Sequence, residues 1–129
     1  QTALGGLGPW IRAKEGRSFV CHPDLQETGE VLCDTGSPLS EVQNMFSEDL
    51  KLIDLSEVQE GWQLKEGINR DTADTLKARL CRFQEWLKAR PEKTIVIVAH
   101  HNVFLAMLRV SFLNCEVRKY QFDVVPAAS

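Results

Sequence analysis

The stretch TIVIVAHHNVFLAML (residues 94–108) gives the strongest indication of the fold class, because it contains an unbroken apolar run that ends on two adjacent histidines. Residues 94–99 are mostly β-branched. Continuous rather than alternating apolarity is typical of a strand buried on both faces, as in a parallel sheet. Each imidazole would be costly in apolar surroundings unless it were hydrogen-bonded. The stretch therefore predicts a buried strand that ends on two polar side chains, followed by a helix over residues 103–113.

A long helix is predicted over residues 72–90, directly before this strand. Asp71 or Thr72 is available as its N-cap, and Pro91 follows its end. Its apolar positions recur at helical spacing: Leu76, Leu80, Phe83 and Leu87. A final strand is expected over residues 115–125. The alternation of helices with strands favours an α/β fold.

The first half of the chain gives weaker signals. Residues 1–15 predict a helix weakened by glycines, with Gly16 as C-cap. Residues 18–27 predict a short strand broken by Pro23, and Ser37 is expected to cap a short helix. We interpret residues 47–70, which have no clean period, as an insertion over one face. The strand at 94–99 is expected to run parallel to residues 19–21, between the helices at 72–90 and 103–113.

Composition narrows the class of protein. The 129 residues suit a single domain (1–129), and 43% hydrophobic and 26% charged residues are ordinary for a soluble protein. A net charge of −3 without a basic run argues against nucleic acid or an anionic membrane as partner. The longest apolar run is too short to span a membrane, and no secretory signal opens the chain. The chain begins at Gln1 rather than Met, which suggests a fragment, a processed product or a truncated chain.

Four cysteines are present, and none has the spacing of a zinc site. Cys81 and Cys115 stand in apolar segments, where a free cysteine behaves as a small hydrophobe. Disulfides are rare in cytosolic proteins, so we expect reduced thiols in a cytoplasmic protein, with two disulfides as the alternative.

His100 marks the first candidate site, because ligands of α/β sheets bind at the carboxyl ends of strands. The following helix would offer free backbone N–H groups to an anion, and Asn102 suits its N-cap. A histidine here could bind an anion or act as a general base or nucleophile. The alternative is that both histidines only cap the strand through backbone hydrogen bonds.

Four short motifs occur in a consistent order: QTAL (1–4), LQETGE (25–30), AHHN (99–102) and NCEVRKYQF (114–122). In this order they resemble the histidine phosphatase superfamily, the phosphoglycerate-mutase-like proteins, and LQETGEVLCDTGS with EGW is most similar to fungal-type members. The resemblance covers nearly the whole chain. It implies a three-layer α/β sandwich with a mostly parallel sheet, of which this chain would be the C-terminal two-thirds.

The resemblance also assigns roles in phosphomonoester hydrolysis or phosphoryl transfer. His100 would be the second active-site histidine, which holds the transferring phosphoryl group, and Glu27 the acid that protonates the leaving alkoxide. His101 and Asn102 occupy positions that are usually Gly-Gly or Gly-Asn in the family, so His101 would narrow the pocket or add a donor at its mouth. A small phosphorylated or anionic substrate is implied, without a metal or cofactor. From the residues alone, Glu27 would be a solvated loop glutamate.

One part of the family pattern is absent. The chain has no RHG motif, which carries the nucleophilic histidine of the family, and His22 is interpreted as a surface or strand-end residue. The chain alone is therefore expected to be inactive as a phosphatase. The family's first two strands would also be missing beside residues 94–99, which predicts self-association or complementation by an N-terminal segment.

Two other functions remain open. The first is a non-catalytic domain that binds a small anion or a protein, which AHHN in place of a glycine pair favours. The second is a repurposed lyase or isomerase in which His100 and Glu27 transfer protons.

Overall fold

The computed structural model describes residues 1–13, 15–29 and 31–121, and it has a mixed helical architecture with a small parallel sheet. Strand β1 (Phe19–Val20) pairs in parallel with β2 (Ile53–Asp54), with Phe19 opposite Ile53. The Cys21 N–H extends this ladder by donating to the Asp54 carbonyl at 2.9 Å. The α/β character is thus present, although the sheet has only two short strands among the described residues.

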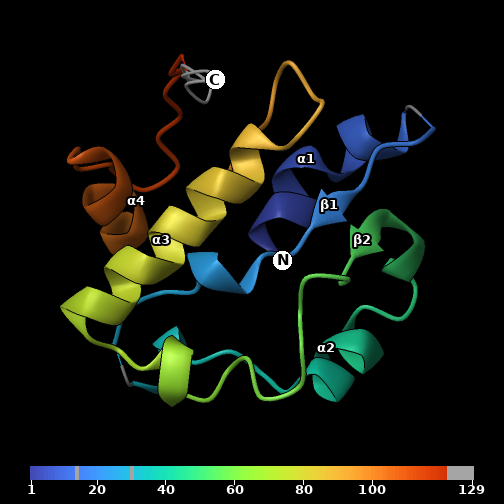
Figure 1. Cartoon of the computed structure of the whole chain (residues 1–129). Helices are drawn as coiled ribbons and strands as arrows, with labels where there is room; N and C mark the ends of the chain where they lie inside the picture. The colour runs from blue at the N-terminus through green and yellow to red at the C-terminus, as the bar shows by residue number, and fades with distance from the viewer. Residues whose placement is uncertain (14, 30, 122–129) are drawn as a thin grey trace.

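Helix α3 (Ala73–Lys88) confirms the long helix predicted at 72–90. Thr72 caps it by accepting a hydrogen bond from the Thr75 N–H, so of the two candidate caps the structure uses Thr72. The helix packs against the 3₁₀ helix Pro23–Leu25, which follows β1. In Figure 1, α3 crosses the molecule diagonally, with α4 on one side and the two strands on the other.

The other helices are shorter. Helix α1 spans Thr2–Arg12, α2 spans Leu39–Met45 and α4 spans His101–Leu108. The predicted caps were wrong for two of them, because the C-cap of α1 is Ala13 rather than Gly16 and the N-cap of α2 is Pro38 rather than Ser37. Three further 3₁₀ helices complete the described elements: Leu32–Asp34, Leu50–Leu52 and Gly67–Asn69.

The strand predicted at residues 94–99 is wrong for this structure. Residues 91–100 carry neither helix nor strand, and Ile95, Val96 and Val98 are 39%, 57% and 45% exposed. A strand exists only where a second backbone completes its ladder. The proposed parallel neighbour at residues 19–21 instead pairs with β2, which lies inside the region interpreted as an insertion.

The last two predicted elements are also shorter or absent. The helix expected at 103–113 starts earlier and ends at Leu108, because Arg109 adopts a left-handed conformation with φ 59°. Residues 115–121 form no strand, and the rest of the strand expected at 115–125 lies outside the described residues.

The core combines few apolar residues with several buried polar ones. Among the described residues, the buried hydrophobic side chains are Ile11, Leu80, Phe83 and Val103. Four polar residues are equally buried: Asp24, Gln26, Glu27 and Arg79. Cys81 and Cys115 are exposed, which corrects their interpretation as small core hydrophobes.

Candidate functional site

The structure brings the two predicted catalytic residues together. Glu27 Oε2 lies 3.6 Å from His100 Nδ1, although the two residues are far apart in the sequence. The Glu27 side chain is only 9% exposed, whereas that of His100 is 56% exposed. The pair therefore joins a buried carboxylate to an imidazole that solvent and a ligand can reach, an arrangement suited to proton transfer or to binding an anion.

Glu27 is held in place by its neighbours. Its Oε1 atom accepts hydrogen bonds from the Thr28 N–H at 2.7 Å and the Thr28 hydroxyl at 3.3 Å. The Lys65 ammonium donates to the Glu27 carbonyl oxygen at 2.8 Å, and burial lowers the pKa of Lys65. These contacts leave Oε2 to face His100.

Two arginines of α3 fix the chain just before Glu27. Arg79 is 1% exposed and donates through Nη1 to the carbonyl oxygens of Asp24 (3.3 Å) and Gln26 (3.0 Å). Arg82 donates from Nε and Nη2 to the two carboxylate oxygens of Asp24 at 3.2 and 2.5 Å. Because both anchors come from the longest helix, the position of Glu27 is tied to the most regular element of the fold.

Sequence reasoning missed these arginines and Lys65. A usable signal was present for Arg79, which lies three residues after Leu76 and four before Phe83 and therefore on the apolar face of the helix. A charged residue on such a face is rarely buried without a partner. No such sequence pattern singles out Lys65.

Glu27 and His100 share a small polar pocket with a volume of about 140 Å³. Its lining residues are Gln26, Glu27, Cys33, Asp34, Thr35, Gly36, Trp62 and His100. The buried Oε1 atom of Gln26 and the indole Nε1 atom of Trp62 have no hydrogen-bond partner in the described residues. Buried polar atoms are nearly always paired, so both atoms retain capacity to bond a ligand or water.

The predicted N-cap of α4 was wrong. His100 itself is the N-cap, with φ −90° and ψ 163°, and Asn102 is the second residue of the helix. The first helical hydrogen bond runs from the Phe104 N–H to the His100 carbonyl at 3.1 Å. The N–H groups of His101, Asn102 and Val103 therefore have no partner within the helix.

The side chains of His101 and Asn102 are not brought into the pocket. Neither residue is among the lining residues, and both are exposed. The Nδ1 atom of His101 lies 2.9 Å from the Phe112 carbonyl oxygen, so its ring contacts the segment after α4 instead.

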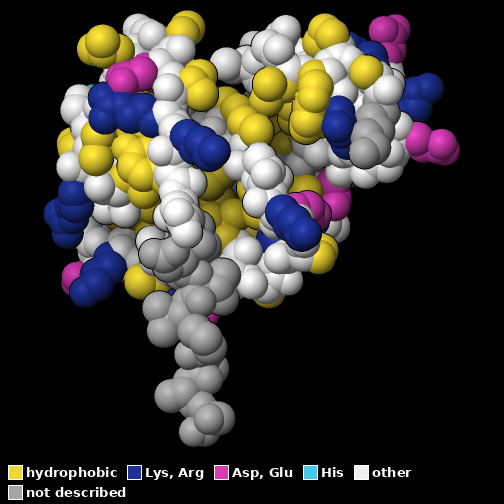
Figure 2. All heavy atoms as spheres, turned by 90° about the horizontal axis from the view of Figure 1, so that it is seen from above, with side chains coloured by type: hydrophobic (Ala, Val, Ile, Leu, Met, Phe, Trp, Pro, Cys, Tyr) yellow, Lys and Arg dark blue, Asp and Glu magenta, His cyan; other side chains and the backbone are white. Residues whose placement is uncertain are grey.

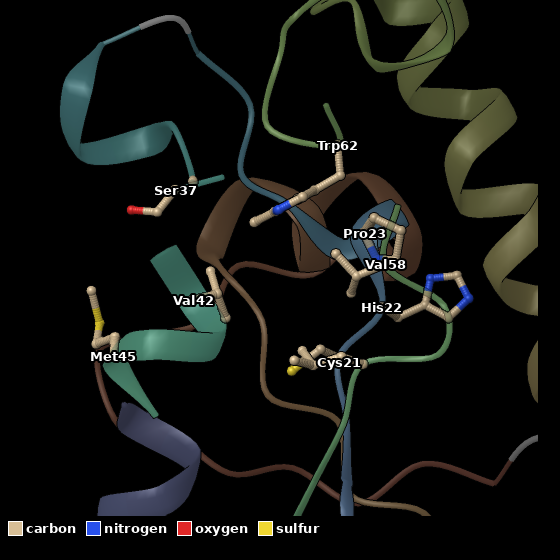
Figure 3. A pocket seen from close by; sticks show the side chains of 10 residues that line it. Cys21, His22, Pro23, Ser37, Val42, Met45, Val58 and Trp62 are labelled. Atoms are coloured by element: carbon tan, nitrogen blue, oxygen red, sulfur yellow. The ribbon is translucent and has the colours of Figure 1, made fainter. Parts of the chain in front are cut away.

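His22 lies two residues after the end of β1, close to the strand end as expected, and its side chain packs against α3. Its Nδ1 accepts from the Asp24 N–H at 3.3 Å, and its ring meets Phe83 and Trp86 edge-on, each with centroids 4.9 Å away. Burial lowers the pKa of His22. In Figure 3 its ring is turned toward α3, at one side of a second, mainly apolar cavity of about 260 Å³.

That second cavity is separated from the polar pocket by Trp62 and Gly36, which line both. Figure 3 shows Val42 and Met45 of α2 on one side and Cys21, His22 and Pro23 on the other. A Cβ atom on Gly36 would lie 2.3 Å from the Trp62 ring, so the wall between the two cavities requires glycine there.

In the part of the chain that the structure describes, no group of three or more His, Cys, Asp and Glu side chains is placed to hold a metal ion. No described helix combines the length and apolarity needed to cross a membrane. Comparison with protein families, curated proteins and solved structures finds no match to this chain.

Proposed function

We propose that this chain is a histidine-phosphatase-like domain, built on the three-layer plan of that superfamily, whose Glu27–His100 pocket binds the phosphoryl group of a small phosphomonoester. The observation that carries the proposal is the 3.6 Å approach of Glu27 Oε2 to His100 Nδ1. The two residues were singled out from different motifs, LQETGE and AHHN, and they meet at one polar pocket.

In this proposal His100 and Glu27 have different roles. The exposed imidazole of His100, in its protonated form, donates to phosphoryl oxygens, with help from the unpartnered N–H groups at the start of α4. The buried carboxylate of Glu27 faces His100 Nδ1 and orients its ring. The resemblance gives Glu27 the role of the acid that protonates a leaving alkoxide, a step that would need a nucleophile in addition to these two residues. Arg79 and Arg82 act as positioning residues, because they hold the backbone before Glu27 and do not line the pocket.

We further propose that this chain binds phosphomonoesters without forming a phosphohistidine through a second imidazole. The sequence contains three histidines, and the structure describes all of them. His22 is packed against α3 and His101 contacts the Phe112 carbonyl, so neither faces His100 across the pocket.

A cytoplasmic setting fits the four free cysteines, because cytosolic proteins rarely keep disulfides.

Calorimetric titration with inorganic phosphate tests the proposal. The wild-type chain should bind in the millimolar range, and His100→Ala should weaken binding about tenfold, because a charge-assisted hydrogen bond contributes about 1.5–3 kcal/mol. Glu27→Gln keeps the Oε1 acceptor for Thr28 and removes a negative charge beside the anion, so affinity should rise. His101→Ala is the matched control, a neighbouring imidazole outside the pocket, and should change nothing. Equal affinities for wild type and His100→Ala would refute the phosphate site.

Intact-mass measurement after incubation with p-nitrophenyl phosphate tests the absence of a phosphoenzyme. We expect no added phosphoryl group and no release of nitrophenol above background. A stable phosphoryl adduct on the wild-type chain would show that it carries its own nucleophile.

A second candidate function is proton transfer on a non-phosphorylated substrate, as in a lyase or isomerase. The presence of one carboxylate–imidazole pair with no second imidazole in the described pocket favours it. Under this alternative, phosphate has no specific affinity for the pocket, and His100→Ala leaves the titration unchanged.

A further inference from the structure

Residues 94–99 form an unpaired apolar segment. Their sequence, TIVIVA, contains no charged or strongly polar side chain, and three of its aliphatic side chains are 39–57% exposed. Among the described residues, no backbone N–H or C=O of this segment takes part in a hydrogen bond with another backbone group. Strongly β-forming residues thus present both apolar surface and free backbone groups.

Further large apolar side chains are exposed after α4. Leu113, Val117 and Tyr120, in the chain after α4, are 79%, 90% and 47% exposed. Figure 2 shows apolar side chains gathered on the face seen from above, and the loop that leads from α3 toward residues 94–99 reaches the top of Figure 1. Large exposed apolar side chains gathered on one face are characteristic of an interface.

The unpaired backbone indicates what kind of partner fits. A helix or a lipid surface would cover the aliphatic side chains but leave six residues of N–H and C=O groups without partners. A second extended segment satisfies both needs, because it supplies a hydrogen-bonded ladder and cross-strand aliphatic contacts. The short parallel pairing of β1 with β2 leaves no described strand of the same chain to do this.

We propose that residues 94–99 pair with the same residues of a second copy of this chain, as an antiparallel two-stranded ladder. In the symmetric register Val96 lies opposite Ile97, Ile95 opposite Val98 and Thr94 opposite Ala99. Every cross-strand pair is then uncharged, and the charged Glu92 and Lys93 lie just beyond the ladder. The antiparallel arrangement has two-fold symmetry and closes as a dimer, whereas a parallel in-register stack would continue as an open filament.

Sedimentation velocity over a range of protein concentrations tests this pairing. The wild-type chain should shift from monomer to dimer as concentration rises, and Val96→Lys should weaken dimerisation at least tenfold, since a charge on an exposed strand edge blocks pairing. Leu32→Lys is the matched control, because Leu32 is 94% exposed outside the segment, and it should dimerise like wild type. Val98→Lys repeats the test should Val96→Lys fail to give the wild-type circular dichroism spectrum.

Amide hydrogen exchange separates a strand ladder from contact between side chains alone. Exchange at residues 94–99 should slow when the protein is concentrated enough to dimerise, and it should stay fast in Val96→Lys. A wild-type chain that is monomeric at every concentration overturns the proposal. So does a dimer that both lysine variants retain, a dimer without protection at residues 94–99, or an assembly that grows without limit.

Discussion

Arg79 shows how a single side chain sets the geometry of the candidate site. Its guanidinium is fully enclosed, and burial lowers the pKa of Arg79, yet it forms no salt bridge within 4 Å among the described residues. Its hydrogen bonds go instead to the carbonyl oxygens of Asp24 and Gln26. A buried cation that bonds main-chain carbonyls fixes backbone, and here the backbone leads directly into Glu27.

His22 gives a residue-scale prediction for the pH dependence of stability. Burial is the largest influence on His22 and lowers its pKa, so the neutral form is favoured in the folded state. The charges of Asp24 and Glu57 oppose this effect and raise the pKa, whereas the charge of Arg82 lowers it further. The unfolded chain takes up a proton first, at about pH 6.5. The free energy of unfolding should therefore fall as pH falls through about 6.5 and level off below the folded-state pKa of His22.

Urea unfolding between pH 7.5 and 5.5 measures this effect. In His22→Asn the amide oxygen can still accept from the Asp24 N–H, but nothing titrates at this position. The variant should lose the decrease in stability in this range, whereas His101→Asn, at an exposed histidine, should keep it. An unchanged pH profile in His22→Asn would mean that another group causes the decrease.

At the scale of elements, the sequence predicted the long helix correctly, because a helix is determined by residues that are close in the sequence. The features that define helix α3 are all local: Thr72 is its cap, leucines and Phe83 recur at helical spacing, and Pro91 follows just after its end. The segment at residues 94–99 has an equally strong local pattern but forms no strand, because a strand depends on a partner that its own residues cannot specify. Strand β2 was missed for the converse reason, since Ile53 and Asp54 gain their conformation only by pairing with β1.

The cap of α3 yields the element-scale prediction. Thr72→Ala removes the acceptor for the Thr75 N–H and should lower the free energy of unfolding by about 1 kcal/mol. The melting temperature should fall by about 3–5 °C. Thr72→Ser keeps the hydroxyl and should stay close to wild type. Equal loss in both variants would indicate that the methyl group of Thr72, rather than its cap, stabilises the helix.

At the scale of the whole molecule, the structure places side by side two residues that the motifs had singled out separately, Glu27 and His100. Glu27 and His100 meet because α3 anchors the chain before Glu27 while His100 begins α4. The side chains of His101 and Asn102, which were predicted to bind the substrate, do not line the pocket, because α4 begins at His101 and turns both of them away from it. Which side of a helix faces a site depends on the residue at which the helix begins, and the sequence placed that start two residues too late.

A phosphoryl site at the Glu27–His100 pair is best tested by proton NMR of the histidine side chains during titration with inorganic phosphate. The chain has three imidazoles, so two of them serve as internal controls for the third. We predict that the ring resonances of His100 shift in a saturable manner, while those of His22, packed against Phe83 and Trp86, and of His101, beside the Phe112 carbonyl, stay in place. Resonances of His100 that do not move at saturating phosphate, or that move no more than those of His22 and His101, would contradict a phosphoryl site at the Glu27–His100 pair.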